Sequence, residues 1–125
     1  MSPPAADCPF CAQTDKVLKN DLAYACYDKN PVTEGHLLLI PFRHMAGFFD
    51  ATRDERLALL SLLDEAKCLI DRLHRPDGYN IGVNVGTCAG QTIGHLHIHF
   101  IPRYQGDMAN PRGGVRGVIP ARQDY

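Results

Sequence analysis

The chain has 125 residues and a net charge of −1 at pH 7, from 13 basic and 14 acidic side chains. This length suits one domain that buries about two thirds of its unfolded surface, and the charge balance excludes the basic footprint of a nucleic-acid-binding protein. No apolar run approaches the roughly 18 residues of a membrane span, and residues 1–7 lack the features of a secretory leader.

The first half of the chain predicts two strands followed by a long helix. Residues 22–27 form the first strand, and the apolar run 35–41 forms a buried second strand that ends at Pro41. Thr52 followed by Glu55 is the capping-box pattern that opens a helix. Apolar residues then recur at steps of three and four and should face a core: Leu59, Leu63, Ala66, Ile70 and Leu73.

The second half predicts two more strands after a stop at residues 76–78. Residues 79–85 alternate apolar and polar side chains, and a polar, glycine-rich loop then leads to a last strand at residues 95–101. The expected fold is therefore α+β, an antiparallel sheet with one long helix on one face. We expect a single domain over residues 1–125, with residues 1–7 and 106–125 loosely structured or extended.

Three of the six histidines lie within seven residues, in His95-Leu96-His97-Ile98-His99-Phe100-Ile101. In a strand, alternate side chains share a face, so the three imidazoles should project together about 6.6 Å apart. The stretch is compatible with a polar sheet face or with a metal site, but no Asp or Glu occurs between Tyr79 and Tyr104. Titratable groups concentrated on one face favour chemistry.

The loop before this strand suits anions. Residues 86–92 offer backbone N–H groups, a hydroxyl and a carboxamide, and Asn84 lies on the polar side of its strand. A glycine-rich loop alone is a weak signal, but its position beside three histidines favours phosphate. A neutral imidazole has a free lone pair at pH 7 and can attack phosphorus, which splits one displacement into two easier ones. His95 and His99 would then supply tautomer control, hydrogen bonds or protonation.

The run from Gly90 to Arg103 resembles the signature of the histidine-triad (HIT) superfamily, and the resemblance extends over most of residues 7–104. Gln91-Thr92 and Pro102-Arg103 are similar to its fragile-histidine-triad, dinucleoside-polyphosphate-hydrolase branch. This resemblance implies an enzyme, and a homodimer with a sheet continued across the subunits. The odd number of cysteines and the sequence of residues 1–7 separately predict a cytoplasmic location. The resemblance also implies these roles: His97 as nucleophile, His99 and His36 in the catalytic network, Asp28 at the ribose, and Asn84, Gln91 and Thr92 at the α-phosphate.

Two of these residues have simpler alternatives. His36 is also compatible with a hydrogen-bonded core histidine, and Asp28 with an Asx turn. Arg112 and Arg116 in the tail are compatible with phosphate contacts or with solvated charges.

The five cysteines, an odd number, indicate reduced thiols or metal ligands rather than a disulfide framework. Cys8-Pro9-Phe10-Cys11 has metal-ligand spacing, although a free thiol pair fits it too. Some bacterial HIT proteins and the galactose-1-phosphate uridylyltransferases resemble this chain in pairing such cysteines with two histidines. That resemblance implies a structural Zn²⁺ bound by Cys8, Cys11, His44 and His95. Cys26 and Cys68 are expected to be buried as small hydrophobic residues.

Three functions remain open from the sequence. The first is hydrolysis of dinucleoside polyphosphates through a nucleotidyl-histidine, and the Gln91-Thr92 pair favours it. The second keeps this chemistry but takes nucleoside phosphoramidates. The third is a zinc-stabilised nucleotide-binding regulator without catalysis. All three have a nucleotide ligand, and none involves nucleic acid or a membrane.

Overall fold

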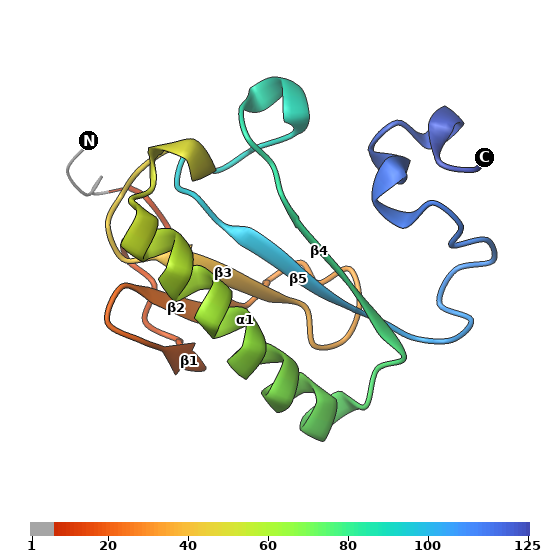
Figure 1. Cartoon of the computed structure of the whole chain (residues 1–125), viewed down its shortest axis with the longest axis horizontal. Helices are drawn as coiled ribbons and strands as arrows, with labels where there is room; N and C mark the ends of the chain where they lie inside the picture. The colour runs from red at the N-terminus through yellow and green to blue at the C-terminus, as the bar shows by residue number, and fades with distance from the viewer. Residues whose placement is uncertain (1–6) are drawn as a thin grey trace.

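The structure, a computed structural model, describes residues 7–125; the expected loose N-terminus therefore lies, except for Asp7, outside the described residues. Five antiparallel strands form one sheet in the order β1-β2-β3-β5-β4, and the helix α1 covers one face of it (Figure 1). The predicted α+β fold is confirmed. The elements are β1 (Leu18–Lys19), β2 (Ala23–Tyr27), β3 (Leu37–Pro41), α1 (Arg53–His74), β4 (Gly78–Val83) and β5 (Ile98–Arg103).

The helix α1 begins at the predicted capping box. The Thr52 hydroxyl accepts the Glu55 N–H at 3.1 Å, and the Glu55 carboxylate accepts the Thr52 N–H at 2.8 Å. The buried stripe then follows steps of three, four and four through Leu59, Leu62, Ala66 and Ile70. Among the described residues, no helix has the length and apolar character that crossing a membrane requires.

One predicted stripe position of α1 needs correction. Leu63 packs against the core as predicted, although it is only partly buried and the neighbouring Leu62 is buried. Leu73 is 55% exposed in the last turn. In that turn the side chain of His74 packs against Gly35 instead: a Cβ added to Gly35 would lie 3.0 Å from the His74 ring. The prediction for Cys68 was also wrong, because this side chain lies on the exposed face of α1.

The last strand is shorter at its start than predicted, because β5 begins at Ile98 rather than at His95. The Leu96 N–H donates to the Met45 carbonyl at 2.9 Å instead of to a neighbouring strand. β5 lies between β3 and β4, with His99 opposite Leu38 and Gly82. Ile98 and Phe100 face α1, so the odd-numbered residues of β5 face the other side of the sheet.

The edge strand β4 ends at Val83, two residues before the predicted end. Tyr79 and Val83 pack against the core on the side of α1, whereas Ile81 is 48% and Val85 39% exposed. Ile81 stays exposed because β4 is the last strand of the sheet and β5 is its one strand neighbour among residues 7–125, whereas Val85 lies beyond the end of β4.

The tail after Gly106, expected from composition to be loose or extended, turns back beside β4 (Figure 1). It includes two short 3-10 helices, Gly114–Val118 and Pro120–Arg122. Gly113 enters the first of them with φ of 85°, and a Cβ there would lie 1.9 Å from the Gln123 carbonyl oxygen. The two 3-10 helices are thus packed tightly on each other.

Candidate active site and metal cluster

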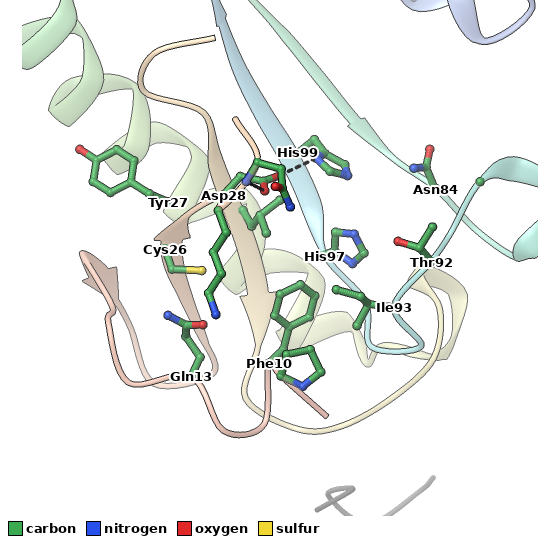
Figure 2. A pocket seen from close by; sticks show the side chains of 15 residues that line it. Phe10, Gln13, Cys26, Tyr27, Asp28, Asn84, Thr92, Ile93, His97 and His99 are labelled. Carbon is green, nitrogen blue, oxygen red and sulfur yellow. Dashed lines mark hydrogen bonds and ion pairs between the residues drawn. The ribbon is translucent and has the colours of Figure 1, made fainter. Parts of the chain in front are cut away.

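A cavity of about 360 Å³ opens on the face of the sheet opposite α1. His97 and His99 line it together with Asp28, Asn84 and Thr92 (Figure 2). These five residues come from the ends of β2, β4 and β5 and from the loop before β5, so the sheet brings distant parts of the chain together. The predicted nucleophile, His97, thus shares the wall of this cavity with four residues that were predicted to bind substrate or to take part in catalysis.

Two of the three triad histidines line the cavity, although Leu96, Ile98 and Phe100 all pack into the core on the side of α1, as the alternation predicts. His95 is fully buried and is not among the residues that line the cavity, whereas His97 is 6% exposed and the side chain of His99 24% exposed. The ring of His97 lies between those of Phe10 and His99, at centroid distances of 5.0 and 5.1 Å. Two imidazoles therefore face the cavity and the third has another role.

One hydrogen bond defines the tautomer of His97. Its Nδ1 lies 2.9 Å from the backbone carbonyl oxygen of His95. A carbonyl oxygen only accepts hydrogen bonds, so Nδ1 must carry the proton and Nε2 keeps its lone pair. This is the protonation state that a nucleophilic imidazole requires.

A second chain of contacts runs from Asp28 through His36 to His99. The Val32 N–H donates to His36 Nδ1 at 3.0 Å, so the ring proton of His36 is on Nε2. That nitrogen lies 3.0 Å from His99 Nδ1 and 3.5 Å from the Asp28 carboxylate. His99 Nδ1 therefore accepts a hydrogen bond from His36 Nε2–H, and His99 Nε2–H is left to donate elsewhere.

Burial keeps this pair of histidines neutral. It lowers the pKa of His36 and of His99 below the ordinary value of 6.5, and the carboxylate of Asp28 opposes the shift only in part. Although the three side chains have metal-ligand spacing, a neutral His36 ring that accepts the Val32 N–H has no second lone pair for an ion. The geometry supports a hydrogen-bonded chain instead.

The loop before β5 is held by Gln91. Its Oε1 accepts the Gly86 N–H at 2.9 Å, and its Nε2 donates to the carbonyls of Ala46 at 2.6 Å and Ile93 at 3.0 Å. Gln91 is not among the residues that line the cavity. Of the predicted phosphate-binding residues, Asn84 and Thr92 thus face the cavity, while the carboxamide of Gln91 contacts its own loop.

Sequence reasoning missed several residues of the cavity wall. Phe10 packs against both His95 and His97, at centroid distances of 5.9 and 5.0 Å, and Gln13 and Lys29 also line the cavity. The signal for Phe10 was its place between the two cysteines: if Cys8 and Cys11 bind near His95, the residue between them must lie beside the triad.

The four predicted metal ligands form a second cluster directly behind the cavity. Their ligand atoms all lie within 4.8 Å of one another. Cys8 Sγ is 3.4 Å and Cys11 Sγ 3.5 Å from His95 Nδ1. His44 Nδ1 is 3.2 Å from His95 Nδ1 and 3.3 Å from Cys11 Sγ. Tetrahedral zinc with these ligand types places ligand atoms roughly 3.3–3.8 Å apart.

Neighbouring groups orient the ligands of this cluster. His95 Nε2 donates to the Pro41 carbonyl at 2.8 Å, which leaves the lone pair of Nδ1 toward the cysteines. Arg43, next to His44, makes two hydrogen bonds with Glu55 at 2.7 and 2.9 Å, which fix the loop of His44 to the start of α1. The donor set and its surroundings fit a structural zinc ion.

The sequence matches the model of the HIT domain over residues 11–106. The chain belongs to the HIT family. Its similarity to solved structures of HIT proteins extends over most of the fold. A HIT family protein from Bacillus anthracis superposes with a TM-score of 0.77 at 33% identity, over 83% of this chain and 78% of that one. A zinc-bound histidine triad family protein from Mycobacterium smegmatis superposes with a TM-score of 0.74 at 28% identity, over 83% of this chain and 80% of that one.

Two curated relatives of this HIT protein carry names of enzymes. The AP-4-A phosphorylase of Mycobacterium tuberculosis is 37% identical over 92 residues, which cover 73% of this chain and 47% of that protein. The asymmetrical bis(5'-nucleosyl)-tetraphosphatase of Schizosaccharomyces pombe is 32% identical over 91 residues, which cover 73% of this chain and 50% of that protein. The chain thus spans about half the length of these relatives.

Proposed function

We propose that this HIT protein is a hydrolase that cleaves nucleotides at the α-phosphate through a covalent nucleotidyl-histidine at His97. The observation that carries the proposal is the hydrogen bond of His97 Nδ1 to the His95 carbonyl, because it leaves a lone pair on Nε2. Dinucleoside polyphosphates are the proposed substrates. The names of the two curated relatives, an AP-4-A phosphorylase and a tetraphosphatase, support this choice.

The proposed reaction has two steps. Nε2 of His97 bonds to the α-phosphorus while the bond from phosphorus to the leaving oxygen breaks, and that oxygen departs with the electron pair. His99 Nε2–H donates a hydrogen bond to the departing oxygen. Water then attacks the same phosphorus, the phosphorus–nitrogen bond breaks, and a nucleoside monophosphate leaves with its proton passed to solvent. Positioning and hydrogen bonding supply most of the rate enhancement in such transfers.

The remaining site residues have assigned roles in this proposal. Asp28 binds the ribose hydroxyls, Asn84 and Thr92 bind the α-phosphate, and His36 holds the tautomer of His99. These assignments rest on the cavity wall that Asp28, Asn84 and Thr92 share with His97. Gln91 acts through the loop whose backbone it holds.

A zinc ion and a second subunit complete the proposal. Zn²⁺ would be held by Cys8, Cys11, His44 and His95, whose ligand atoms all lie within 4.8 Å of one another, and would stabilise the fold without taking part in the reaction. A homodimer with a sheet continued through the edge strand β4 accounts for the exposed side chain of Ile81. A cytoplasmic location, a single domain over the whole chain, and the absence of nucleic-acid and membrane partners stay predictions.

One observation favours a second candidate substrate, a nucleoside phosphoramidate. Among the described residues that line the cavity, Lys29 is the sole Lys or Arg side chain. A tetraphosphate bridge carries several negative charges and would gain from more cations, whereas the phosphorus–nitrogen bond of a phosphoramidate makes no such demand. His97 Nε2 forms the same bond to phosphorus with both substrates, but with a phosphoramidate the phosphorus–nitrogen bond breaks as the nitrogen takes a proton from solvent, so that a neutral amine leaves.

The test compares release of adenosine monophosphate from diadenosine tetraphosphate and from an adenosine phosphoramidate. The full chain should release it from at least one of them. His97→Ala should lose turnover by several orders of magnitude and keep nucleotide binding, whereas the matched control His74→Ala, at the end of α1, should keep both. A His97→Ala variant that stays active would refute the proposal, and a full chain inactive on both compounds would favour a regulator without catalysis.

A further inference from the structure

The loop between β2 and β3, residues 28–36, carries three of the groups on which the chain of contacts at His99 depends. They are the carboxylate of Asp28, the N–H of Val32 and the ring of His36. The loop has no helix or strand of its own, and a hydrogen bond from the Asp28 N–H to the His36 carbonyl at 3.0 Å joins its ends. Such a loop keeps one shape only where contacts to neighbouring elements hold it.

The position of the Val32 N–H decides where two rings carry their protons. A neutral imidazole can carry its proton on either nitrogen, and the partner of one nitrogen selects the form. The Val32 N–H makes Nδ1 of His36 the acceptor, so Nε2 donates to His99 Nδ1 at 3.0 Å and His99 keeps its own proton on Nε2. Without the Val32 N–H, the proton of His36 is free to move to Nδ1. His99 would then donate from its own Nδ1 and have no proton on Nε2.

Two hydroxyl groups hold this loop to the chain at the end of β5. The Thr33 hydroxyl donates to the carbonyl of Pro102, and the Tyr104 hydroxyl donates to the carbonyl of Glu34 at 2.5 Å. Gly35, the next residue of the loop, lies so close that an added Cβ would be 3.3 Å from the Pro102 side chain. This part of the loop is thus held against the end of the strand.

The attachment to β5 matters because the same strand carries His99. Pro102 lies three residues after His99, and the Thr33 that binds its carbonyl directly follows Val32. The side chain of Val32 contributes little to holding the loop, because it is 67% exposed. The hydroxyl groups therefore fix the backbone N–H relative to the ring whose proton it controls.

The two hydroxyl groups lie outside the proposed substrate site. Thr33 and Tyr104 are not among the residues that line the cavity of His97 and His99. Removal of either hydroxyl should therefore leave the groups that bind the substrate in place. An effect on the protons of the two rings should then lower kcat with little change in KM.

We propose that Thr33 and Tyr104 are positioning residues for the proposed reaction. Their hydroxyl groups hold residues 28–36 on β5, and this loop sets the proton positions on His36 and His99. The proposal rests on the proposed function and deepens it, because it explains what keeps the Nε2–H of His99 available to the leaving oxygen.

The test removes both hydroxyl groups with little change in side-chain volume, in the double variant Thr33→Val/Tyr104→Phe. Long-range nitrogen–proton NMR correlation spectra of the histidine rings report which nitrogen carries each proton. At neutral pH the full chain should show His36 and His99 protonated on Nε2, and the double variant should show a mixture of both forms on each ring. With diadenosine tetraphosphate or an adenosine phosphoramidate, whichever the full chain cleaves faster, kcat should fall about tenfold or more while KM changes less than about twofold.

Further variants separate positioning from a general loss of structure. Thr33→Ser keeps the hydroxyl group and should keep both proton positions and kcat. Glu34→Gln changes a side chain that is 82% exposed but retains the carbonyl that Tyr104 binds, so it should also have no effect. Thermal unfolding shows whether each variant is folded, and Tyr104→Phe alone gives the same comparison if the double variant is not.

The spectra decide on this proposal without turnover. Unchanged proton positions in the folded double variant would overturn it even if the Tm or kcat falls, because the hydroxyl groups would then act on stability alone. A mixture of forms with an unchanged kcat would overturn it as well. Failure of the full chain to cleave either compound would refute the hydrolase, while the proton positions on His36 and His99 would still show whether the hydroxyl groups hold the loop.

Discussion

The Nδ1 atom of His97 lies 2.9 Å from the backbone oxygen of His95, whose own ring belongs to the cluster of cysteines and histidines. The residue that sets the tautomer of the proposed nucleophile is thus also a candidate zinc ligand. A shift of His95 in the cluster would therefore move the carbonyl oxygen that orients the ring of His97 in the cavity.

This connection predicts that metal loss affects both stability and turnover. The full chain purified without chelator should hold about one zinc per chain. Cys11→Ser should lose the metal and lower the Tm by several degrees. The kcat should also fall, because the His95 carbonyl that orients His97 would be displaced. Elemental analysis, thermal unfolding and kinetics measure these effects. Cys68→Ser, on the exposed face of α1, is the control and should change none of them; zinc well below one per chain in the unmodified protein would contradict the site.

The neutral pair of His36 and His99 predicts the acid limb of the pH profile. Burial lowers the pKa of both rings below the ordinary 6.5, so both are neutral at pH 7 and become protonated only in more acidic solution. Protonation places hydrogens on both facing nitrogens and breaks their contact. We expect kcat/KM for a dinucleoside polyphosphate to stay level at neutral pH and to fall only below pH 6.5.

Substitution of Asp28 tests whether protonation of His36 and His99 causes the fall of kcat/KM in acid. The Asp28 carboxylate raises the pKa of both histidines, so Asp28→Asn should move the acid limb to lower pH. The profile is read from about pH 4.5 to 8.5 by initial rates. A limb at or above pH 6.5 in the full chain, or an upward shift in Asp28→Asn, would be inconsistent with the neutral pair.

The buried carboxylate of Glu55 predicts a stability effect. Hydrogen bonds from Arg43 and from Thr52 lower its pKa from 4.5 to about 2. A lowered pKa means that the ion pair stabilises the fold fully above pH 4.5 and that this contribution is lost as pH falls toward 2. Because the side chain of Arg43 is 29% exposed, solvent screens the pair, and Glu55→Gln should cost about 1–2 kcal/mol of unfolding free energy in denaturant at pH 7. Glu65→Gln, on the exposed side of the same helix, should cost less than about 0.5 kcal/mol; equal effects would show that the pair with Arg43 contributes little.

The three hydrogen bonds of Gln91 predict that it acts on the loop rather than on phosphate directly. Gln91→Ala should increase amide hydrogen exchange across residues 86–94, because each lost bond contributes about 1 kcal/mol. KM should rise more than kcat falls. Cys88→Ala, an exposed change in the same loop, should leave exchange unaltered. Unchanged exchange in Gln91→Ala with a raised KM would instead favour direct contact with the substrate.

Sequence patterns predicted the parts of the fold that local rules govern. The capping box at Thr52 and the alternation around His99 are local, and both have the expected geometry. The start of β5 could not be predicted from local patterns, because the Leu96 N–H donates to the carbonyl of Met45, a partner 51 residues away in sequence. The prediction that Leu73 faces the core was wrong for a similar reason, since packing around Gly35 decides which side chain of the last turn is covered.

The candidate site was predictable where residue type and spacing carry the chemistry. Asn84 and Thr92 face the cavity as expected, and Cys8 and Cys11 lie at ligand distance from His95. What spacing could not give was the direction of Gln91, because its carboxamide is satisfied by backbone groups of its own loop and of Ala46. A cavity of about 520 Å³ between β4 and tail residues 114–118 was also not predictable, since it depends on how the tail returns to β4.

The most direct test of the central claim is to trap the covalent intermediate. The full chain is mixed with diadenosine tetraphosphate labelled in its α-phosphates and quenched within milliseconds in base, where a phosphorus–nitrogen bond survives. Peptide mass spectrometry should place an adenylyl group on His97, and the adduct should disappear after an acid quench. An active enzyme that yields no adduct under base, or an adduct on His99 or His36 instead, would contradict the account.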